Sequence, residues 1–194
     1  MADPLAEAMI RFRALNTYQV TLRSVAADGE RQVIRYYYRK PGWVRMEFVQ
    51  PHGGAVLIYD PDTRRVRLWP LGLKHTLALT FAPNNPLVRG SRGHRADRSD
   101  VGALLENLLA LRARGNASPL GEADLAARPT VGFDIVGAAG VTVAGVHRYQ
   151  VWLAQDTLFP LRVKSFEASG YPIETVDMTE VETDVHFSEG FFTP

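Results

Sequence analysis

The sequence contains no cysteine. Disulfide bonds, thiol catalysis and zinc sites with cysteine ligands are therefore excluded, whereas the absence is compatible with either an oxidising or a reducing compartment. No run of residues approaches the ~18 consecutive apolar residues that a membrane-spanning helix needs. Residues Met1–Pro4 carry no signal peptide, and we expect that one has been removed from this sequence.

Recognisable catalytic motifs are also missing. The sequence has no Gly-x-Ser-x-Gly nucleophile elbow, no Gly-x-Gly-x-x-Gly or phosphate-binding loop, and no His-Glu-x-x-His. Its five histidines are scattered along the chain. We therefore expect no enzymatic activity, no cofactor and no bound metal.

Charge of one sign is not in excess, because the formal net charge is only +1. Such a balance excludes a strong field for nucleic acid or for an anionic membrane. Four short basic clusters read as solvated strand faces and loops; they are Arg35–Lys40, Arg64–Arg67, Arg89–Arg98 and Arg112–Arg114. With 194 residues, of which 46% are hydrophobic and 22% charged, we expect one globular domain covering residues 1–194.

The hydrophobic pattern changes its period along the chain. Three- and four-residue spacing predicts a helix over Leu5–Leu15, and leucines from Ser99 to Arg114 predict a second one. Alternation with a period of two predicts strands on both sides of that second helix. The expected strands are Tyr18–Val25, Gln32–Arg39, Trp43–Val49, Ala55–Tyr59, Arg65–Trp69, Thr130–Val136, Val141–Leu153, Leu158–Ala168 and Ile173–Val185.

The segment Leu71–Arg98 has no clean period, and it reads as a long loop, of the kind that often has a function. Sheets of about nine strands tend to curl. We therefore predict a mainly β (α+β) fold, in which one strongly curved antiparallel sheet packs helices into or over its concave face.

The most polar cluster combines His94, Asp97, Ser99 and Asp100. His94 and Asp97 could share a metal ion, but a loop followed by a helix N-cap explains the same residues, and we favour that structural interpretation. A similar choice exists for His147, which could bind a ligand headgroup or be a half-buried histidine whose hydrogen bonds are satisfied. We favour the second.

Four segments resemble a known family, the periplasmic outer-membrane lipoprotein carriers (the LolA/LolB-like superfamily). Arg39–Phe48 is similar to their basic, Pro-containing turn and aromatic-rich strand, and Ala55–Pro70 to their next hairpin. Leu158–Gly170 resembles a late hairpin, and Phe191–Pro194 resembles the end of the family sequences. The resemblance runs through most of the chain, as that of a divergent member.

The resemblance implies an incomplete β-barrel with a helical lid and an apolar cavity for acyl chains. Ser99–Arg114 and Leu71–Arg98 would form the lid, and Lys40 stands where the carriers have an arginine that bonds to it. Lysine lacks the planar fork of arginine, which puts that latching role in question. Face alternation selects these cavity residues: Tyr36, Met46, Phe48, Ile58, Leu68, Phe81, Leu104, Leu108, Tyr149, Val151 and Phe166.

Two functions follow. The first is a carrier of lipid or lipoprotein acyl chains, a chaperone-like transport protein of outer-membrane lipoprotein sorting or envelope lipid handling. The second is a non-catalytic module with a filled cavity that binds an envelope protein. Either implies a periplasmic location, with no nucleic-acid partner and only peripheral membrane contact. The protein would be soluble or anchored to the outer membrane through a lipidated cysteine outside this sequence.

Overall fold

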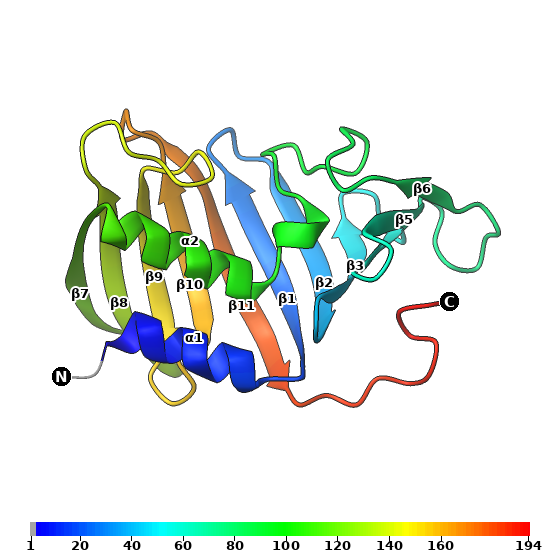
Figure 1. Ribbon diagram of the computed structural model, residues 1–194, viewed down its shortest axis with the longest axis horizontal. Coiled ribbons are helices and arrows are strands. Elements are labelled where there is room, and N and C mark those ends of the chain that lie inside the picture. Colours follow the sequence, from blue (N-terminus) through cyan, green and yellow to red (C-terminus); the bar gives the residue numbers. More distant parts are fainter. Residues whose placement is uncertain (1–2) are drawn as a thin grey trace. The chain divides into compact units, whose positions relative to one another are not determined.

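The protein is described by a computed structural model that covers residues 3–194 (Figure 1). It is mainly β, with two α-helices and one short 3-10 helix in this range. The elements in chain order are α1 (Pro4–Ala14), β1 (Thr17–Ala26), β2 (Arg31–Arg39), β3 (Trp43–Gln50), β4 (Val56–Asp60), β5 (Arg65–Trp69), β6 (Leu79–Phe81), η1 (Ala96–Arg98), α2 (Val101–Ala113), β7 (Gly115–Leu125), β8 (Arg128–Gly137), β9 (Arg148–Ala154), β10 (Pro160–Phe166) and β11 (Pro172–Thr183).

The strands form one sheet in the order β6-β5-β4-β3-β2-β1-β11-β10-β9-β8-β7. Neighbouring strands such as β2 and β3, or β9 and β10, pair antiparallel. Strands β6 and β7 end the order, so the sheet is not closed into a barrel. The expected fold, a mainly β incomplete barrel with helices, is confirmed. No helix in residues 3–194 combines the length and the hydropathy needed to cross a membrane.

The chain divides into two compact units, and each is described by itself. Unit 1 comprises the described residues up to Ala14, together with Arg23–Glu30 and Val101–Thr179. Unit 2 comprises Leu15–Leu22, Arg31–Asp100 and Glu180–Pro194. The prediction of one domain for residues 1–194 stays a prediction.

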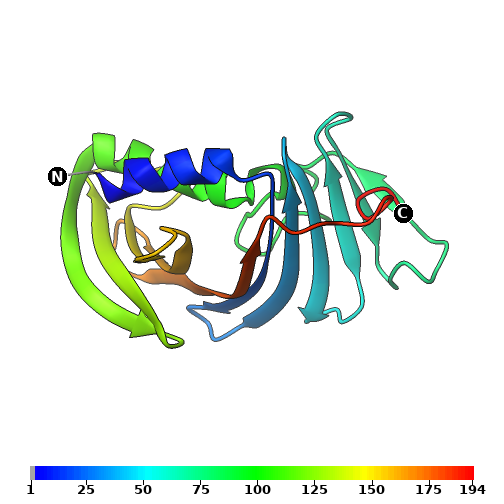
Figure 2. The same ribbon diagram turned by 90° about the horizontal axis from the view of Figure 1, so that it is seen from below.

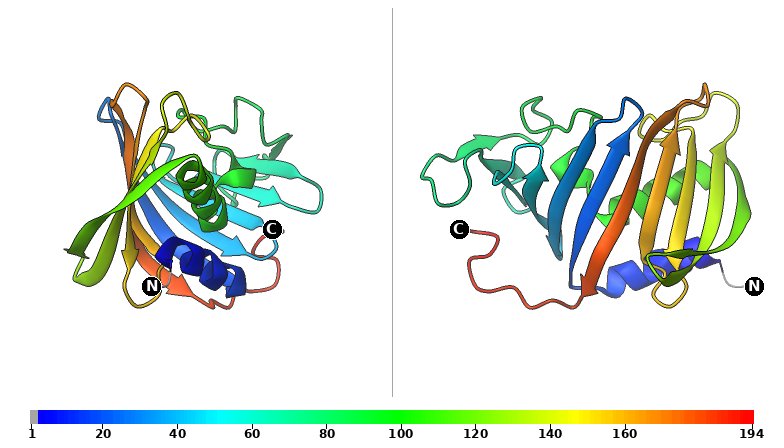
Figure 3. Two further views of the ribbon diagram at one scale, coloured as in Figure 1. Left: turned by 60° about the vertical axis from the view of Figure 1, so that its left-hand side comes forward. Right: turned by 180° about the vertical axis from the view of Figure 1, so that it is seen from behind.

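In unit 1 both α-helices lie on the same side of strands β7 to β10, and the strands curve around that side (Figure 2). Helix α1 begins at Pro4, where the Asp3 carboxylate accepts hydrogen bonds from the N–H groups of Leu5 and Ala6. This is the capping geometry that satisfies free N–H groups at a helix start. Among the described residues, no helix lies on the other face of these strands (Figure 3, right).

Strand β7 is an element that the sequence did not reveal. Helix α2 ends at Ala113, and β7 begins at Gly115. A Cβ atom at Gly115 would meet the Val136 carbonyl oxygen at 2.0 Å, so the close approach of β7 to β8 requires glycine here. Most residues of β7 are exposed, which removes the alternation that marks a half-buried strand.

The strand expected over Val141–Leu153 is shorter than predicted, because β9 begins only at Arg148. The residues before it form a loop in which Val143 and Val146 pair with each other. His147 Nδ1 lies 2.7 Å from the Val141 carbonyl oxygen, so the imidazole ring is hydrogen-bonded to the backbone of this loop. The structural interpretation of His147 is confirmed.

In unit 2, strands β2 to β6 form an antiparallel meander. The five predicted hairpin strands are confirmed within a few residues. The segment Leu71–Arg98 is mostly loop as expected, but it also contributes β6 and η1. These two elements have three residues each, too few for a period to be recognised.

Candidate functional site

One face of the unit 2 meander carries two continuous rows of mostly apolar side chains. Residues that pair directly across antiparallel strands lie on the same face of a sheet, so the register defines both rows. The first row is Tyr36, Met46, Leu57, Leu68 and Leu79. The second row is Tyr38, Val44, Tyr59, Val66 and Phe81. We call this surface the loop-covered face.

Half of the side chains in the two rows of the loop-covered face are buried, and the other half keep part of their surface accessible. Leu57 and Val66 are buried, and they pack with Val88 and Ala96 from the segment between β6 and α2. Five further side chains pack against this cluster while keeping part of their surface accessible: Met46, Phe48, Tyr59, Leu68 and Phe81. Four of them belong to the predicted cavity set, so the structure does bring these four together.

Tyr36, another predicted cavity residue, is fixed at one end of the first row. Its hydroxyl oxygen lies 2.8 Å from Ser99 Oγ, and Ser99 Oγ also donates a hydrogen bond to the Ala96 carbonyl. Tyr18 stacks on Tyr36 and Tyr38 at ring distances of 6.1 and 5.0 Å. Burial raises the pKa of Tyr36 well above its ordinary value, so its hydroxyl stays neutral.

Besides Phe166, four predicted cavity residues lie in unit 1. Leu104 and Leu108 belong to α2, and Tyr149 and Val151 to β9. Leu108 and Val151 have no exposed surface. Burial raises the pKa of Tyr149 to about 12, while a hydrogen bond with the Asn107 side chain acts in the opposite direction. Leu108, Tyr149 and Val151 belong to the buried core of unit 1, whereas Leu104 is half-buried.

Two predicted cavity residues lie on the other face of their strands. Ile58 pairs with Arg45 and Arg67, so it faces away from Met46 and Leu68. Phe166 pairs with Arg148, whose guanidinium lies 5.4 Å from its ring centre. The register thus places Ile58 on the face opposite the two rows, and Phe166 on the face of its strand opposite Ser165, which pairs with Tyr149.

Lys40, the candidate latch for the lid, is exposed at the end of β2. Its backbone N–H donates to the Asn16 carbonyl at 2.8 Å. The latching role stays a prediction.

The polar cluster around His94 does not come together as a metal site. Asp97 is held by Arg95 through two hydrogen bonds of 3.0 and 2.6 Å, and Ser99 contacts Tyr36. Within residues 3–194, no group of three or more His, Cys, Asp or Glu side chains could hold a metal ion.

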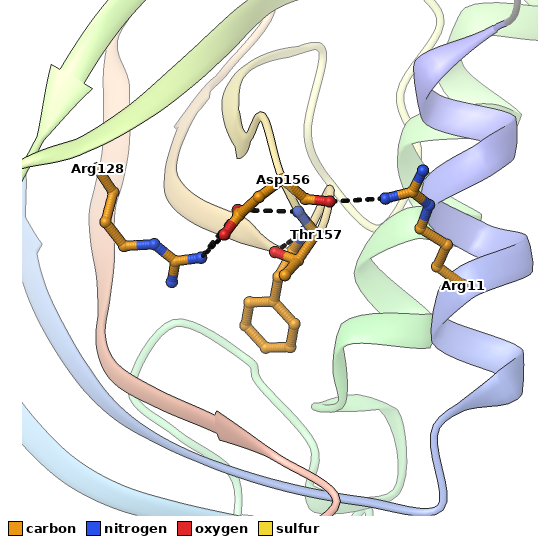
Figure 4. A network of polar contacts seen from close by, with 5 residues as sticks. Arg11, Arg128, Asp156 and Thr157 are labelled. Atoms are coloured by element: carbon orange, nitrogen blue, oxygen red, sulfur yellow. Dashed lines mark hydrogen bonds and ion pairs between the residues drawn. The ribbon is translucent and has the colours of Figure 1, made fainter.

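A polar surface pocket, which sequence reasoning missed, lies at one end of unit 1. It has a volume of about 420 Å³ and is lined by Arg128, Pro129, Gln155 and Asp156. Arg128 Nη2 donates to the Asp156 carboxylate at 3.0 Å, and Arg11 of α1 donates to the Asp156 carbonyl at 2.8 Å (Figure 4). The charged side chains of Arg128 and Asp156 in this pocket already pair with each other. The hydrogen bond from Arg11 to Asp156 connects α1 to the β9–β10 turn.

Comparison by sequence finds no similar protein, whereas comparison by structure does. No protein-family model matches the chain, and no curated protein matches it. Solved structures do match. An uncharacterized conserved protein from Thermus thermophilus aligns with a TM-score of 0.62 and 12% identity, over 99% of this chain and 94% of that one.

Two other solved structures have informative names. The chain from the Pseudomonas aeruginosa MucA/MucB complex aligns with a TM-score of 0.56 and 16% identity, over 97% of this chain but 61% of that one. The Mycobacterium tuberculosis lipoprotein LppX aligns with a TM-score of 0.53 and 12% identity, over 95% of this chain and 98% of that one. At these low identities, the TM-scores show that the folds are shared and nothing more. The chain therefore has the same fold as these three proteins.

Proposed function

We propose that this protein is a non-enzymatic binding protein for the acyl chains of lipids or lipoproteins in the periplasm, and that the loop-covered face is its apolar seat. The observation that carries the proposal is the pair of rows across β2 to β6. Half-buried apolar side chains gather there over a buried base of Leu57 and Val66. A continuous apolar surface that stays partly accessible is more typical of a binding site than scattered hydrophobic residues are.

The dimensions of the rows suit a long alkyl chain. Neighbouring strands lie about 4.8 Å apart, so five strands span roughly 19 Å, which is the length scale of a fatty acyl chain. Each CH₂ group removed from water contributes about 0.8 kcal/mol. Because the rows consist of methionine, leucine, valine and aromatic side chains, they favour a ligand by its apolar area and not by a specific headgroup.

The names of the structural neighbours give this proposal only indirect support. One of them is a lipoprotein, and none of the three described above is named as an enzyme. A carrier must also release what it binds, which favours a seat that is only partly covered. The cover here is the loop that places Val88 and Ala96 on the seat.

A lipid-binding measurement tests the proposal. Protein purified from cells is extracted with organic solvent for mass spectrometry, and the delipidated protein is titrated with a pyrene-labelled long-chain fatty acid. We expect co-purified lipid and saturable binding of the probe. Met46→Gln combined with Leu68→Gln should weaken binding about tenfold or more, because 1.4 kcal/mol is tenfold and an unpaired amide in an apolar seat costs about 1–3 kcal/mol.

The matched control is Val49→Gln combined with Leu71→Gln. Both residues are exposed, at 47% and 63%, and neither belongs to the rows. The control should bind the probe like the wild type. Equal binding by both double variants, or a protein that neither carries lipid nor takes up the probe, contradicts the proposal.

The second candidate function is a module that binds an envelope protein. It is favoured by the fully buried core of unit 1, where Leu108 and Val151 have no exposed surface, and by a neighbour that was solved as a two-protein complex. Affinity purification that recovers one protein partner and no lipid would favour this function over the first.

A further inference from the structure

The C-terminal segment Asp184–Pro194, which we call the tail, packs on the opposite face of the unit 2 meander. It is attached near β1, where Asp184 N–H donates to the Thr17 carbonyl and Thr17 Oγ1 donates to the Val185 carbonyl. Figure 2 shows the tail, in red, running past strands β1 to β3. Phe192 has no exposed surface, so the tail is seated in the fold.

The seat of the tail consists of cationic and aromatic side chains of β2 and β3. Arg45 Nη1 donates to the Phe191 carbonyl at 2.7 Å, and the Arg45 guanidinium lies 4.1 Å from the centre of the Phe191 ring. The Arg39 guanidinium lies over the Phe192 ring at 4.7 Å and over Trp43 at 5.3 Å. Two phenylalanine rings are therefore held by two guanidinium groups.

Side chains fix the tail more than its backbone does. Its internal hydrogen bonds are local turns, from Phe191 N–H to the Ser188 carbonyl and from Thr193 N–H to the Gly190 carbonyl. The tail is not one of the strands of the sheet. A segment held by a few anchoring side chains can be replaced by another segment that presents the same groups.

The charges of tail and seat are complementary. The tail carries carboxylates at Asp184 and Glu189 and has no lysine or arginine. The seat strands carry Arg31, Arg35, Arg39 and Arg45 and a single carboxylate, Glu47, which forms an ion pair with Arg45. Opposite charges steer partners together and select against basic peptides.

The seat also has an unused donor. Among residues 3–194, the Nε atom of Arg45 is buried and has no hydrogen-bond acceptor. The Glu47 carboxylate accepts from Nη2 of this guanidinium and the tail offers one carbonyl oxygen at Nη1, so neither of them satisfies Nε. The seat is therefore incompletely satisfied by its present occupant.

We propose that this seat is a docking site for an acidic peptide segment with neighbouring aromatic residues, supplied by a protein partner, and that the tail occupies the site until the partner displaces it. The partner places two aromatic rings against Arg39 and Arg45 and a carboxylate against the free Nε of Arg45. The site lies on the face opposite the acyl-chain seat, so it does not depend on the proposed function.

A peptide-binding experiment on the 194-residue chain tests this site. A fluorescein-labelled synthetic peptide with the sequence of residues 184–194 is titrated against the wild type and against Phe191→Ala combined with Phe192→Ala, which weakens the tail. Fluorescence anisotropy should report binding about tenfold tighter to the double variant, because its own tail competes less. Circular dichroism checks its fold, and Phe191→Ala alone, at a half-buried ring, serves if the double variant does not fold.

Charge variants identify the site. Adding Arg45→Gln to the tail-weakened chain should lower peptide affinity about tenfold, since an arginine hydrogen bond and a ring contact are lost together. Arg128→Gln, an arginine of unit 1, is the matched control and should leave affinity unchanged. Equal affinity for wild type and tail-weakened chain, or no effect of Arg45→Gln, overturns the proposal. A dimer in ultracentrifugation that the peptide dissociates also overturns it, because the occupant is then a second copy of the chain.

Discussion

Arg112 of helix α2 donates a hydrogen bond to the Asp3 carboxylate from Nη1 at 2.7 Å, and its Nη2 lies 2.6 Å from the second carboxylate oxygen. Asp3 also accepts from the first N–H groups of α1. One carboxylate therefore both caps α1 and ties it to α2. Two residues that are 109 positions apart in the chain fix the relative position of the two helices.

The Asp3–Arg112 pair predicts a pH dependence of stability. The hydrogen bond from Arg112 lowers the pKa of Asp3. A lowered folded-state pKa contributes stability above the unfolded value of about 3.9, and this contribution is lost as the pH falls through the folded value. Asp3→Asn should therefore cost at most about 1 kcal/mol at pH 7, because the pair is partly exposed, and less at acidic pH. Urea unfolding at pH 7 and at pH 2 measures this, and an equal cost at both pH values contradicts it.

The core beneath α2 predicts a large effect at Leu108. Its side chain has no exposed surface, and a Leu→Ala change at such a site costs about 2–5 kcal/mol through lost burial and a cavity. Ile10→Ala on α1 is the control, because Ile10 is 62% exposed, and it should change stability by less than about 0.5 kcal/mol. Similar midpoints of urea unfolding for the two variants would rule out this description of the core.

The junction between α2 and β7 predicts strain at Gly115. A Cβ atom there would meet backbone atoms of Val136 and Gly137 at 2.0 and 2.7 Å, so Gly115→Ala must displace β7 or β8. We expect a loss of about 2 kcal/mol or more. At Gly42 a Cβ atom would meet only Pro61 Cβ at 3.5 Å, so Gly42→Ala should be nearly neutral. Thermal unfolding of both variants compares the two sites, and equal stability would mean that the strands do not approach as described.

Buried tyrosines predict a loss of stability in alkaline solution. Burial raises the pKa of Tyr38 and of Tyr149 to about 12. Because the unfolded chain ionises near pH 10, their contribution is fully present below pH 10 and declines as the pH rises toward 12. Tyr149→Phe should therefore unfold at a higher pH than the wild type. Absorbance at 295 nm and far-UV circular dichroism follow ionisation and unfolding, and an unchanged alkaline midpoint would contradict the prediction.

Most of the fold could be predicted from the sequence, because apolar and polar residues alternate regularly from Tyr18 to Trp69 and the turns between these strands are short. The same logic failed for β7, whose side chains are exposed on both faces and therefore show no period. It also failed at Val141–Val146, where apolar residues line a loop that closes on itself. Strand β7 is fixed by its backbone pairing with β8, and the Val141–Val146 loop by its own bridge. Neither arrangement leaves an alternation of buried and exposed side chains in the sequence.

The candidate site was predicted in part. Met46, Phe48, Leu68 and Phe81 were chosen by alternation and do gather on one face. Ile58 was misplaced because β4 is buried on both faces, and its first three residues, 56–58, read as a continuous apolar run. The covering of the second face of the meander depends on the contact of Arg45 with the tail across 146 residues, which the sequence alone cannot reveal.

Strand β7 ends the sheet, so its outer backbone groups could template the addition of a strand from another molecule. Pro119 lies in the middle of this strand and has no N–H to offer. The pairing with β8 also shifts its register between Pro119 and Gly121, which bends the rim at the same point. A regular ladder cannot continue past that break, so this rim resists polymerisation of the protein by edge-to-edge growth even when the molecule is concentrated.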